Sequence, residues 1–314
     1  MLKKTLAALT IGLSFTTAMA QEVTFGIIST EATQNLKADW QPLLDDMEKQ
    51  TGLKVKAFFA PDYAGIIEGM RFNKVQIAWM GNKSAMEAVD RSNAEVFAQM
   101  VNADGTQGYY SHLIVHKDSP LNNLNDLFSN AKNLSFGNGD PNSTSGFLVP
   151  GFYVFAQNKV DAKTAFKVSR SANHEANALA VANKQVDVAT NNSENLDKIK
   201  ERQPEKFKDI KIIWTSPLIA LDPLVMSKNL PEATKTKIKT FFYNYAKTNA
   251  KEKEVVMKIS KLSGFKPSTN DQLKPIRQLD FFAQRNKVEG DSTLTSIEKQ
   301  TKLAEIDQKL AAMK

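Results

Sequence analysis

From Val23 onward the chain alternates short apolar runs with amphipathic segments, and this alternation limits the possible folds more than any other feature. Apolar runs typical of buried strands occupy residues 23–28, 55–60, 77–79 and 96–100. Between them lie helical patterns at residues 35–50, 61–72 and 84–91, the second with Asp62 as a suitable N-cap. Strand–helix–strand order favours α/β domains built on mainly parallel sheets. The chain is therefore expected to contain α/β units.

A second α/β unit follows, and the pattern breaks on either side of it. The strand pattern at 109–116 ends in Lys-Asp-Ser-Pro, and a later strand pattern at 210–214 ends in Ser-Pro. Two breaks around one unit predict an inserted lobe, joined to the first by a two-strand hinge. We therefore expect a first lobe of residues 21–116 and 217–270, an inserted lobe of residues 117–216, and a helical tail of residues 271–314 packed on the first lobe.

The first 20 residues have the pattern of a secretory signal peptide. Two lysines precede an apolar segment at 6–15, and Ala-Met-Ala at 18–20 resembles a cleavage site, so the mature chain should begin near Gln21. The apolar segment is too short to span a bilayer, and no later segment reaches about 18 apolar residues. The chain has no cysteine for a lipid anchor or a disulfide. We expect a soluble periplasmic protein that does not span the membrane.

The charge of the chain does not indicate nucleic acid as a partner. The net charge of +7 falls to +5 without the two lysines of the signal peptide, and the remaining lysines concentrate at 235–261 on amphipathic patterns. There is no basic stripe interleaved with aromatic residues, which single-stranded nucleic acids would require. We therefore expect no nucleic-acid binding. No cofactor is expected either.

Residues 136–147 combine the end of a strand, a tight turn and the start of a helix. Gly137, Gly139 and Pro141 favour the turn, and three hydroxyl residues, Ser143 to Ser145, precede an apolar helical run. Hydroxyl donors and free backbone N–H groups at a helix start can hold an oxyanion. Neither a Walker loop nor a dinucleotide fingerprint is present, and the turn contains no Lys or Arg. The same residues could equally form an ordinary turn and helix cap.

Several longer runs resemble one family in a fixed order. They include FGIIST at 25–30, FFAPDYAGIIEGMRFNKV at 58–75, FGNGDPNSTSGFLVPG at 136–151, HEANALAVANKQVDVATNNSENLDK at 174–198 and PIRQL at 275–279. These runs resemble the PhnD family, the periplasmic solute-binding components of phosphonate ABC transporters. The resemblance covers nearly the whole mature chain and weakens after about Lys247. It implies a class II periplasmic binding fold whose two lobes close over 2-aminoethylphosphonate for delivery to an inner-membrane permease.

The resemblance also implies roles for eight residues. Those expected around the phosphonate are Tyr63, Ser143, Thr144, Ser145 and His174, and those expected around the ammonium are Tyr109, Glu194 and Asp222. The chemistry of the side chains agrees with this division. Hydroxyl groups and an imidazole can donate to phosphonate oxygens, ionised carboxylates can only accept from an ammonium, and a tyrosine ring can face a cation.

Two alternatives remain at this stage. A protein of the same fold could bind phosphate, phosphite or an alkylphosphonate, but such anions would be repelled by Glu194 and Asp222. Ser143 or Ser145 with His174 and Glu194 could also form a hydrolytic triad, although no G-x-S-x-G elbow is present. Metal catalysis is disfavoured because His112 and His116 would lie about 13 Å apart on a strand. The sequence therefore predicts a binding protein and not an enzyme, with no catalytic or metal-binding residue.

Overall fold

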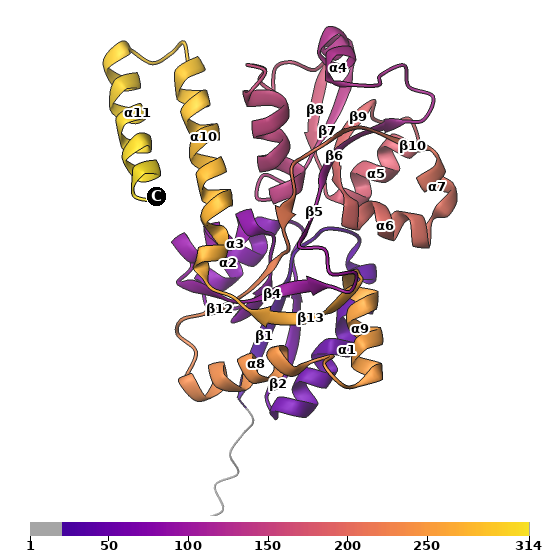
Figure 1. The fold of residues 1–314 in the computed structure, drawn as a ribbon, viewed down its shortest axis with the longest axis vertical. Helices are drawn as coiled ribbons and strands as arrows, with labels where there is room; N and C mark the ends of the chain where they lie inside the picture. The colour runs from indigo at the N-terminus through magenta and orange to yellow at the C-terminus, as the bar shows by residue number, and fades with distance from the viewer. Residues whose placement is uncertain (1–20, 314) are drawn as a thin grey trace, which may run out of the picture.

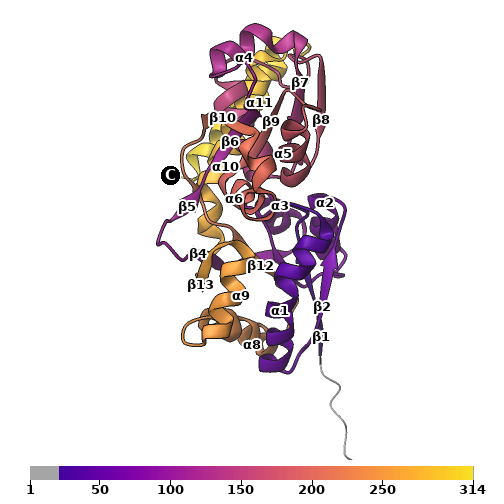
Figure 2. The same ribbon diagram turned by 90° about the vertical axis from the view of Figure 1, so that its right-hand side faces the viewer.

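The computed structural model describes residues 21–313, which form two α/β lobes, one above the other, and a helical extension (Figure 1, Figure 2). The expected signal peptide, residues 1–20, lies outside the described residues. Within residues 21–313, no helix has both the length and the apolar character needed to cross a membrane.

The first lobe is built on a six-stranded sheet with the order β13-β4-β12-β3-β1-β2. Its strands are β1 (Glu22–Ile27), β2 (Lys54–Phe59), β3 (Ile77–Trp79), β4 (Ala94–Asn102), β12 (Pro223–Ser227) and β13 (Leu262–Pro267). Its helices are α1 (Thr33–Thr51), α2 (Tyr63–Arg71), α3 (Asn82–Arg91), α8 (Glu232–Asn244) and α9 (Ala250–Ser260). The core of this lobe is aromatic: the Phe25 ring packs against Trp40 and Phe242, and Phe97 packs against Phe242.

The second lobe is built on a five-stranded sheet with the order β10-β6-β9-β7-β8. Its strands are β6 (Ser111–His116), β7 (Ser135–Asn138), β8 (Val168–Ser171), β9 (Val188–Asn192) and β10 (Ile210–Thr215). Its helical elements are α4 (Leu124–Asn130), η1 (Ala131–Asn133), η2 (Thr144–Leu148), η3 (Gly151–Ala156), α5 (His174–Ala182), α6 (Ser193–Arg202) and α7 (Pro204–Lys208). Separate apolar clusters, one around Phe136 and one around Ile114, form its core.

The expectation of mainly parallel sheets is wrong. β1 pairs in parallel with β2 and β3, and β7 with β8 and β9, but β12, β13 and β10 all run antiparallel to their neighbours. The chain returns from the second lobe and enters β12 at the end of the sheet where the C-termini of β1 and β3 lie. β12 must therefore run in the opposite direction to β1 and β3. The sequence analysis did not predict β12 and β13. β13 contains Gly264 and Pro267, residue types that are depleted in strands, yet pairing with β4 holds this segment as a strand.

A short antiparallel ribbon, β5 (Gly108–Tyr109) with β11 (Ile219–Ala220), lies where the chain passes between the lobes. β6 belongs to the second sheet, although the sequence interpretation assigned residues up to 116 to the first lobe. We therefore propose that the inserted lobe spans residues 110–218, with the two crossings at β5 and β11. The register of the ribbon brings Gly108 opposite Ala220 and Tyr109 opposite Ile219.

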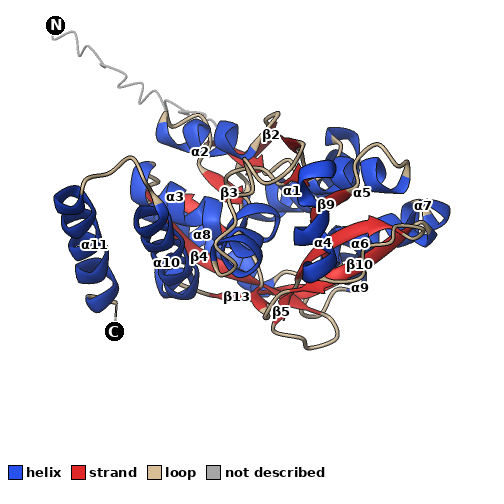
Figure 3. Ribbon diagram, turned by 90° about the horizontal axis from the view of Figure 1, so that it is seen from above, coloured by secondary structure: helices blue, strands red, loops and turns tan. Residues whose placement is uncertain are grey.

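The C-terminal extension consists of η4 (Asn270–Leu273), α10 (Lys274–Gly290) and α11 (Ser296–Ala311). α10 starts beside α3, where Arg277 Nη2 lies 2.7 Å from Asp90 Oδ1. It then runs along the second lobe, where the rings of Phe152 and Phe282 lie 6.3 Å apart. α11 packs back against α10 at one side of the molecule (Figure 3). The tail thus contacts both lobes, whereas the sequence predicted contact with the first lobe alone.

We expect Gly108→Ala to destabilise the protein. A Cβ at this position would lie 2.1 Å from the carbonyl oxygen of Ile219, a backbone atom of the other ribbon strand that cannot move away cheaply. Steric overfilling of this kind costs about 1–3 kcal/mol of unfolding free energy. Chemical denaturation of the variant should show this loss. Gly290→Ala is the matched control, because no atom lies within 4 Å of its added Cβ, and unchanged stability of Gly108→Ala would contradict the close approach.

Candidate functional site

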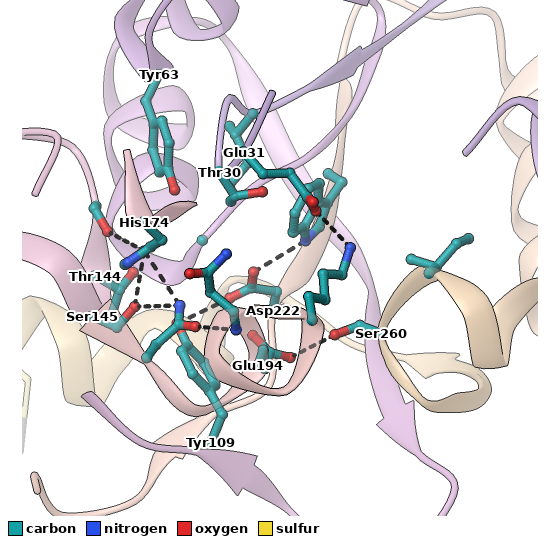
Figure 4. A pocket seen from close by; sticks show the side chains of 18 residues that line it. Thr30, Glu31, Tyr63, Tyr109, Thr144, Ser145, His174, Glu194, Asp222 and Ser260 are labelled. Atoms are coloured by element: carbon teal, nitrogen blue, oxygen red, sulfur yellow. Dashed lines mark hydrogen bonds and ion pairs between the residues drawn. The ribbon is translucent and has the colours of Figure 1, made fainter. Parts of the chain in front are cut away.

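A pocket lies between the two lobes and gathers residues from both (Figure 4). All eight residues singled out from the sequence line it: Tyr63, Tyr109, Ser143, Thr144, Ser145, His174, Glu194 and Asp222. Helical elements of both lobes begin here, namely α2 and α3 from the first lobe and η2, α5 and α6 from the second. The N-terminus of a helix carries partial positive charge and free N–H groups. The wall formed by the second lobe therefore presents partial positive charge and N–H donors, which favour an anion.

The hydroxyl turn is shaped by close backbone packing. A Cβ on Gly139 would lie 2.5 Å from backbone atoms of Gly146, and the Gly139 N–H donates to the Gly146 carbonyl at 3.0 Å. Ser143 caps the helix that follows, because its Oγ accepts from the Gly146 N–H at 2.9 Å. This helix is wound as a π-helix before and after Pro150, whose ring nitrogen has no N–H for the regular ladder. The turn thus holds three buried hydroxyl groups at one wall of the pocket.

Thr144 also connects the two lobes. Its Oγ1 accepts from the backbone N–H of Lys83 at 2.8 Å. Lys83 lies in the first turn of α3, whose own N-cap residue, Gly81, has no side chain to supply this bond. The second lobe therefore caps a helix of the first lobe, and the pocket is closed at this side.

His174 is the first residue of α5 and is buried behind the hydroxyl groups. Its Nε2 lies 3.4 Å from Ser143 Oγ, 3.5 Å from Ser145 Oγ and 3.3 Å from Asn192 Nδ2. Burial lowers the pKa of His174 to about 4, so the imidazole is neutral at pH 7. Its Nδ1 has no hydrogen-bond partner within residues 21–313. A hydrolytic triad would need an acid at that atom, so the arrangement does not fit the hydrolase alternative.

Tyr63 faces this wall from the first lobe. It is the first residue of α2, and the sequence-predicted cap, Asp62, accepts from the Gly65 N–H at 2.8 Å. The backbone N–H of Tyr63 donates to Asp140 Oδ2 at 3.1 Å, which is a second contact across the pocket. Burial, followed by the charges of Asp140 and Asp222, raises the pKa of Tyr63 well above 10. The phenol thus keeps its proton and can donate a hydrogen bond to a ligand.

The opposite end of the pocket contains two carboxyl groups. Asp222 Oδ2 accepts from Trp79 Nε1 at 3.1 Å, and its Oδ1 accepts from the Tyr109 hydroxyl at 3.3 Å. Glu194 lies in the first turn of α6 and accepts from Ser260 Oγ at 3.3 Å. Burial raises the pKa of Glu194 to about 7, and burial together with the charge of Glu194 raises the pKa of Asp222. A ligand cation placed here would relieve both effects.

A group of charged residues holds the lobes together at the rim. Lys198 Nζ lies 2.7 Å from Glu31 Oε1 and 2.9 Å from Asp39 Oδ2, and Arg202 pairs with the same two carboxylates. Lys198 and Arg202 come from α6 in the second lobe, whereas Glu31 and Asp39 come from the first. The carboxylates are almost fully buried, so the pairs are shielded from solvent.

Glu175 adds a further contact between the lobes. Its Oε2 accepts from the Ala32 N–H at 2.6 Å and its Oε1 from Asn35 Nδ2 at 3.0 Å. Ala32 is the N-cap residue of α1 and has no capping side chain. The second lobe thus caps the start of α1 as well as that of α3.

The sequence analysis missed several residues of the pocket wall: Ile28, Thr30, Glu31, Trp79, Gly81, Asn192, Asn195, Lys198, Ile259 and Ser260. A local signal existed for three of them. Asn192 and Asn195 frame Glu194 at the start of α6, and Lys198 lies one turn later on the same helix face. The others come from strand ends, loops and α9, which only the folded chain brings to the pocket.

Comparison with known proteins agrees with this geometry. The family model described as "ABC transporter, phosphonate, periplasmic substrate-binding protein" matches residues 25–273. The phosphonates-binding periplasmic protein of Escherichia coli is 62% identical over 91% of this chain and 84% of its own length. The phosphate-import protein PhnD of Mycolicibacterium smegmatis is 30% identical over 74% of this chain and 75% of its own length.

A solved structure supports the same conclusion about the fold. The binding protein component of an ABC phosphonate transporter from Pseudomonas aeruginosa superposes with a TM-score of 0.92 at 56% identity, over 94% of this chain and 97% of that chain. The expected two-lobed periplasmic binding fold and the expectation that the chain is not an enzyme are therefore confirmed. The chain belongs to the family of periplasmic substrate-binding proteins of phosphonate ABC transporters.

Proposed function

We propose that the pocket binds 2-aminoethylphosphonate and that the protein delivers it unchanged to the permease of its transporter. One observation carries this proposal. A wall of hydroxyl groups and helix N-termini faces two buried carboxyl groups, Glu194 and Asp222, across a single pocket. The pocket thus presents hydrogen-bond donors and partial positive charge at one end and acidic groups at the other. These two ends match the negative and positive groups of a small zwitterion.

The phosphonate end uses neutral donors. Ser143, Ser145 and Tyr63 offer hydroxyl groups, and the first turn of η2 offers backbone N–H groups. Hydrogen bonds from such donors to a charged oxygen are worth about 1.5–3 kcal/mol each. Lys198 is the only cationic side chain among the residues that line the pocket, and Glu31 and Asp39 already pair with it. Capture of an anion by dipoles alone suits reversible binding.

The amine end is the basis for choosing this ligand within the family. Glu194 and Asp222 are buried, and burial raises the pKa of both carboxyl groups, with the charge of Glu194 raising that of Asp222 further. A primary ammonium has three donors and one positive charge, so it can bond to both carboxylates at once. The aromatic ring of Tyr109 lies beside Asp222 and can add a cation–π contact of about 0.5–2 kcal/mol.

Phosphate, phosphite and alkylphosphonates are the competing ligands. A relative from Mycolicibacterium smegmatis is named as a phosphate-import protein, so the family accommodates more than one anion. None of these ligands carries a cation for Glu194 and Asp222, and the carboxylates would repel a bound dianion. We therefore assign them lower affinity in this chain.

We also propose that residues 1–20 are a signal peptide that is removed on export. Two lysines, an apolar segment and Ala-Met-Ala support this assignment. N-terminal sequencing of the protein recovered from the periplasm should begin at Gln21. A chain that keeps Met1 there would contradict the assignment.

Calorimetry should show that the amine strengthens binding. At pH 8 we expect 2-aminoethylphosphonate to bind about 100-fold more tightly than ethylphosphonate, which corresponds to about 2.7 kcal/mol. Glu194 has a pKa of about 7, so the ratio should fall as the pH drops to 5.5 and the carboxylate takes up a proton. Equal affinities for the two ligands at pH 8 would refute the assignment of the acidic end.

Two substitutions should separate the ends of the pocket. Ser143→Ala removes a donor to the phosphonate, so it should weaken both ligands by a similar factor of about 10. Glu194→Gln keeps the shape but removes the charge, so it should weaken 2-aminoethylphosphonate by about 10-fold or more and leave ethylphosphonate unharmed. Fluorescence or calorimetric titration with both ligands measures this partition. If Glu194→Gln weakens ethylphosphonate equally, the division of the pocket is wrong.

A further inference from the structure

The side-chain amide of Asn192 has its orientation set by the helix that follows. Asn192 is the N-cap residue of α6, and its Oδ1 accepts from the backbone N–H of Asn195 at 2.7 Å. A backbone N–H can only donate, so the atom facing it must be the amide oxygen. The amide nitrogen, Nδ2, must therefore point to the other side, which is the pocket.

The orientation of the Asn192 amide in turn determines which ring nitrogen of His174 can accept a hydrogen bond. Asn192 Nδ2 lies 3.0 Å from Ser145 Oγ and 3.3 Å from His174 Nε2. An amide nitrogen has two hydrogens and no lone pair for a hydrogen bond, so His174 Nε2 is best satisfied as an acceptor. The imidazole is neutral because it is buried, and its proton then resides on Nδ1. Nδ1 has no hydrogen-bond partner within the described residues, so the contacts on that side of the ring favour neither tautomer.

The charges around the phosphonate end of the pocket also favour a protonated ligand. The hydroxyl wall of the pocket contains no cation, and Lys198 is engaged by Glu31 and Asp39. A phosphonate dianion would thus be buried against dipoles alone, and uncompensated buried charge is costly. A singly protonated phosphonate halves that charge and brings a hydroxyl group that can donate to an acceptor.

We propose that this pocket takes the phosphonate group as its singly protonated monoanion, with the ligand P–OH donating to the one lone pair of His174 Nε2 in place of the 3.3 Å contact from Asn192. Asn192, whose Nδ2 keeps its bond to Ser145 Oγ, is the positioning residue that disfavours a proton on Nε2. The inference rests on the proposed function and deepens it, since it names the ionic form of the ligand. The hydroxyl groups of Ser143 and Ser145 then turn their hydrogens towards the unprotonated oxygens of the ligand.

Discrimination against sulfonates follows from this arrangement. A sulfonate has the shape of a phosphonate but carries no proton near neutral pH, so it would leave Nε2 of His174 facing a lone pair. A site that is built to pair with a ligand hydroxyl rejects analogues that lack it by large factors, because buried polar groups are left unpaired. We expect 2-aminoethylsulfonate to bind at least about 1,000-fold more weakly than 2-aminoethylphosphonate at pH 6.

Other ionisable groups also face the pocket or the contacts that close it, and they come from both lobes: Glu31, Tyr63, Tyr109, Asp140, Glu175, Glu194, Lys198 and Asp222. Their ionisation acts on any ligand that carries the same amine. Affinity alone therefore does not report the proton on the phosphonate, and a direct observation of the bound ligand is needed.

Phosphorus-31 NMR of bound 2-aminoethylphosphonate provides that observation. Groups of this kind lose their second proton near about pH 6, so the chemical shift of the free ligand changes across that range. For the bound ligand we expect the monoanion shift from pH 5.5 to 8.5. A bound shift that matches the dianion at pH 8 would overturn the inference. Absence of binding at every pH would instead overturn the proposed function, so the two failures are distinguishable.

Asn192→Asp tests the positioning role. Aspartate remains a good N-cap for α6, but it presents an acceptor to His174 and therefore draws a proton onto Nε2. The ratio of sulfonate to phosphonate affinity should rise at least about 10-fold, and the bound phosphonate should shift towards the dianion.

The matched control is Asn173→Asp at the N-cap of α5, which makes the same change of charge at a side chain that accepts from the Ala176 N–H and does not bond to Nε2 of His174. Its affinity ratio and phosphorus-31 shift should match those of the unmodified protein. A purely structural role of Asn192 would weaken both ligands alike and leave the ratio unchanged, which would contradict the proposal.

Discussion

Two carboxyl groups, Glu194 and Asp222, share a buried pocket in which the lining cation, Lys198, already pairs with Glu31 and Asp39, and the organisation of the site depends on this fact. Burial raises the pKa of each, and the charge of Glu194 raises that of Asp222 further. Trp79 and Tyr109 hold Asp222 in place but supply hydrogen bonds and no charge. In the proposed function, a ligand ammonium between the two carboxylates removes this unfavourable interaction, which would couple ligand binding to closure of the two lobes.

Contacts between the lobes also complete two helices of the first lobe. α1 and α3 start without capping side chains of their own, and the second lobe supplies the caps through Glu175 and Thr144. An N-terminal cap contributes about 0.5–2 kcal/mol to stability. Opening the lobes would therefore expose these N–H groups to water at a modest cost in free energy. Contacts of this size fit the proposed function, in which the lobes close on a ligand and later release it. The ion pairs of Lys198 and Arg202 add a further contact that salt and solvent can weaken once the lobes separate.

The same neutral dipoles explain why the protein binds and does not react. The serine hydroxyl groups lie near His174, but no acid orients the imidazole, and the hydroxyl groups already accept from Gly146 and Asn192. Helix N-termini stabilise an anion in its ground state as well as they would a transition state. Uniform stabilisation of this kind gives affinity and no rate enhancement.

Local sequence patterns predict much of this structure. The alternation of apolar and amphipathic segments predicts most strands and helices, Asp62 is recognisable as a cap, and the glycine-rich turn with three hydroxyl residues marks one wall of the pocket. These features depend on neighbours within a few residues, and backbone geometry and capping act at that range. The family resemblance, carried by longer runs, added five further residues, and the structure gathers all eight in one pocket.

Only the tertiary structure decided the rest. The antiparallel direction of β12, the strand character of β13 and the contact of α10 with both lobes depend on pairing between distant segments. Lys198 pairs with Glu31 and Asp39, which precede it by more than 150 residues. The raised pKa of Glu194 and the neutral state of His174 come from desolvation, which exists only in the folded chain, where both lobes surround these side chains. Burial and long-range contact are properties of the packed chain, so no local pattern contains them.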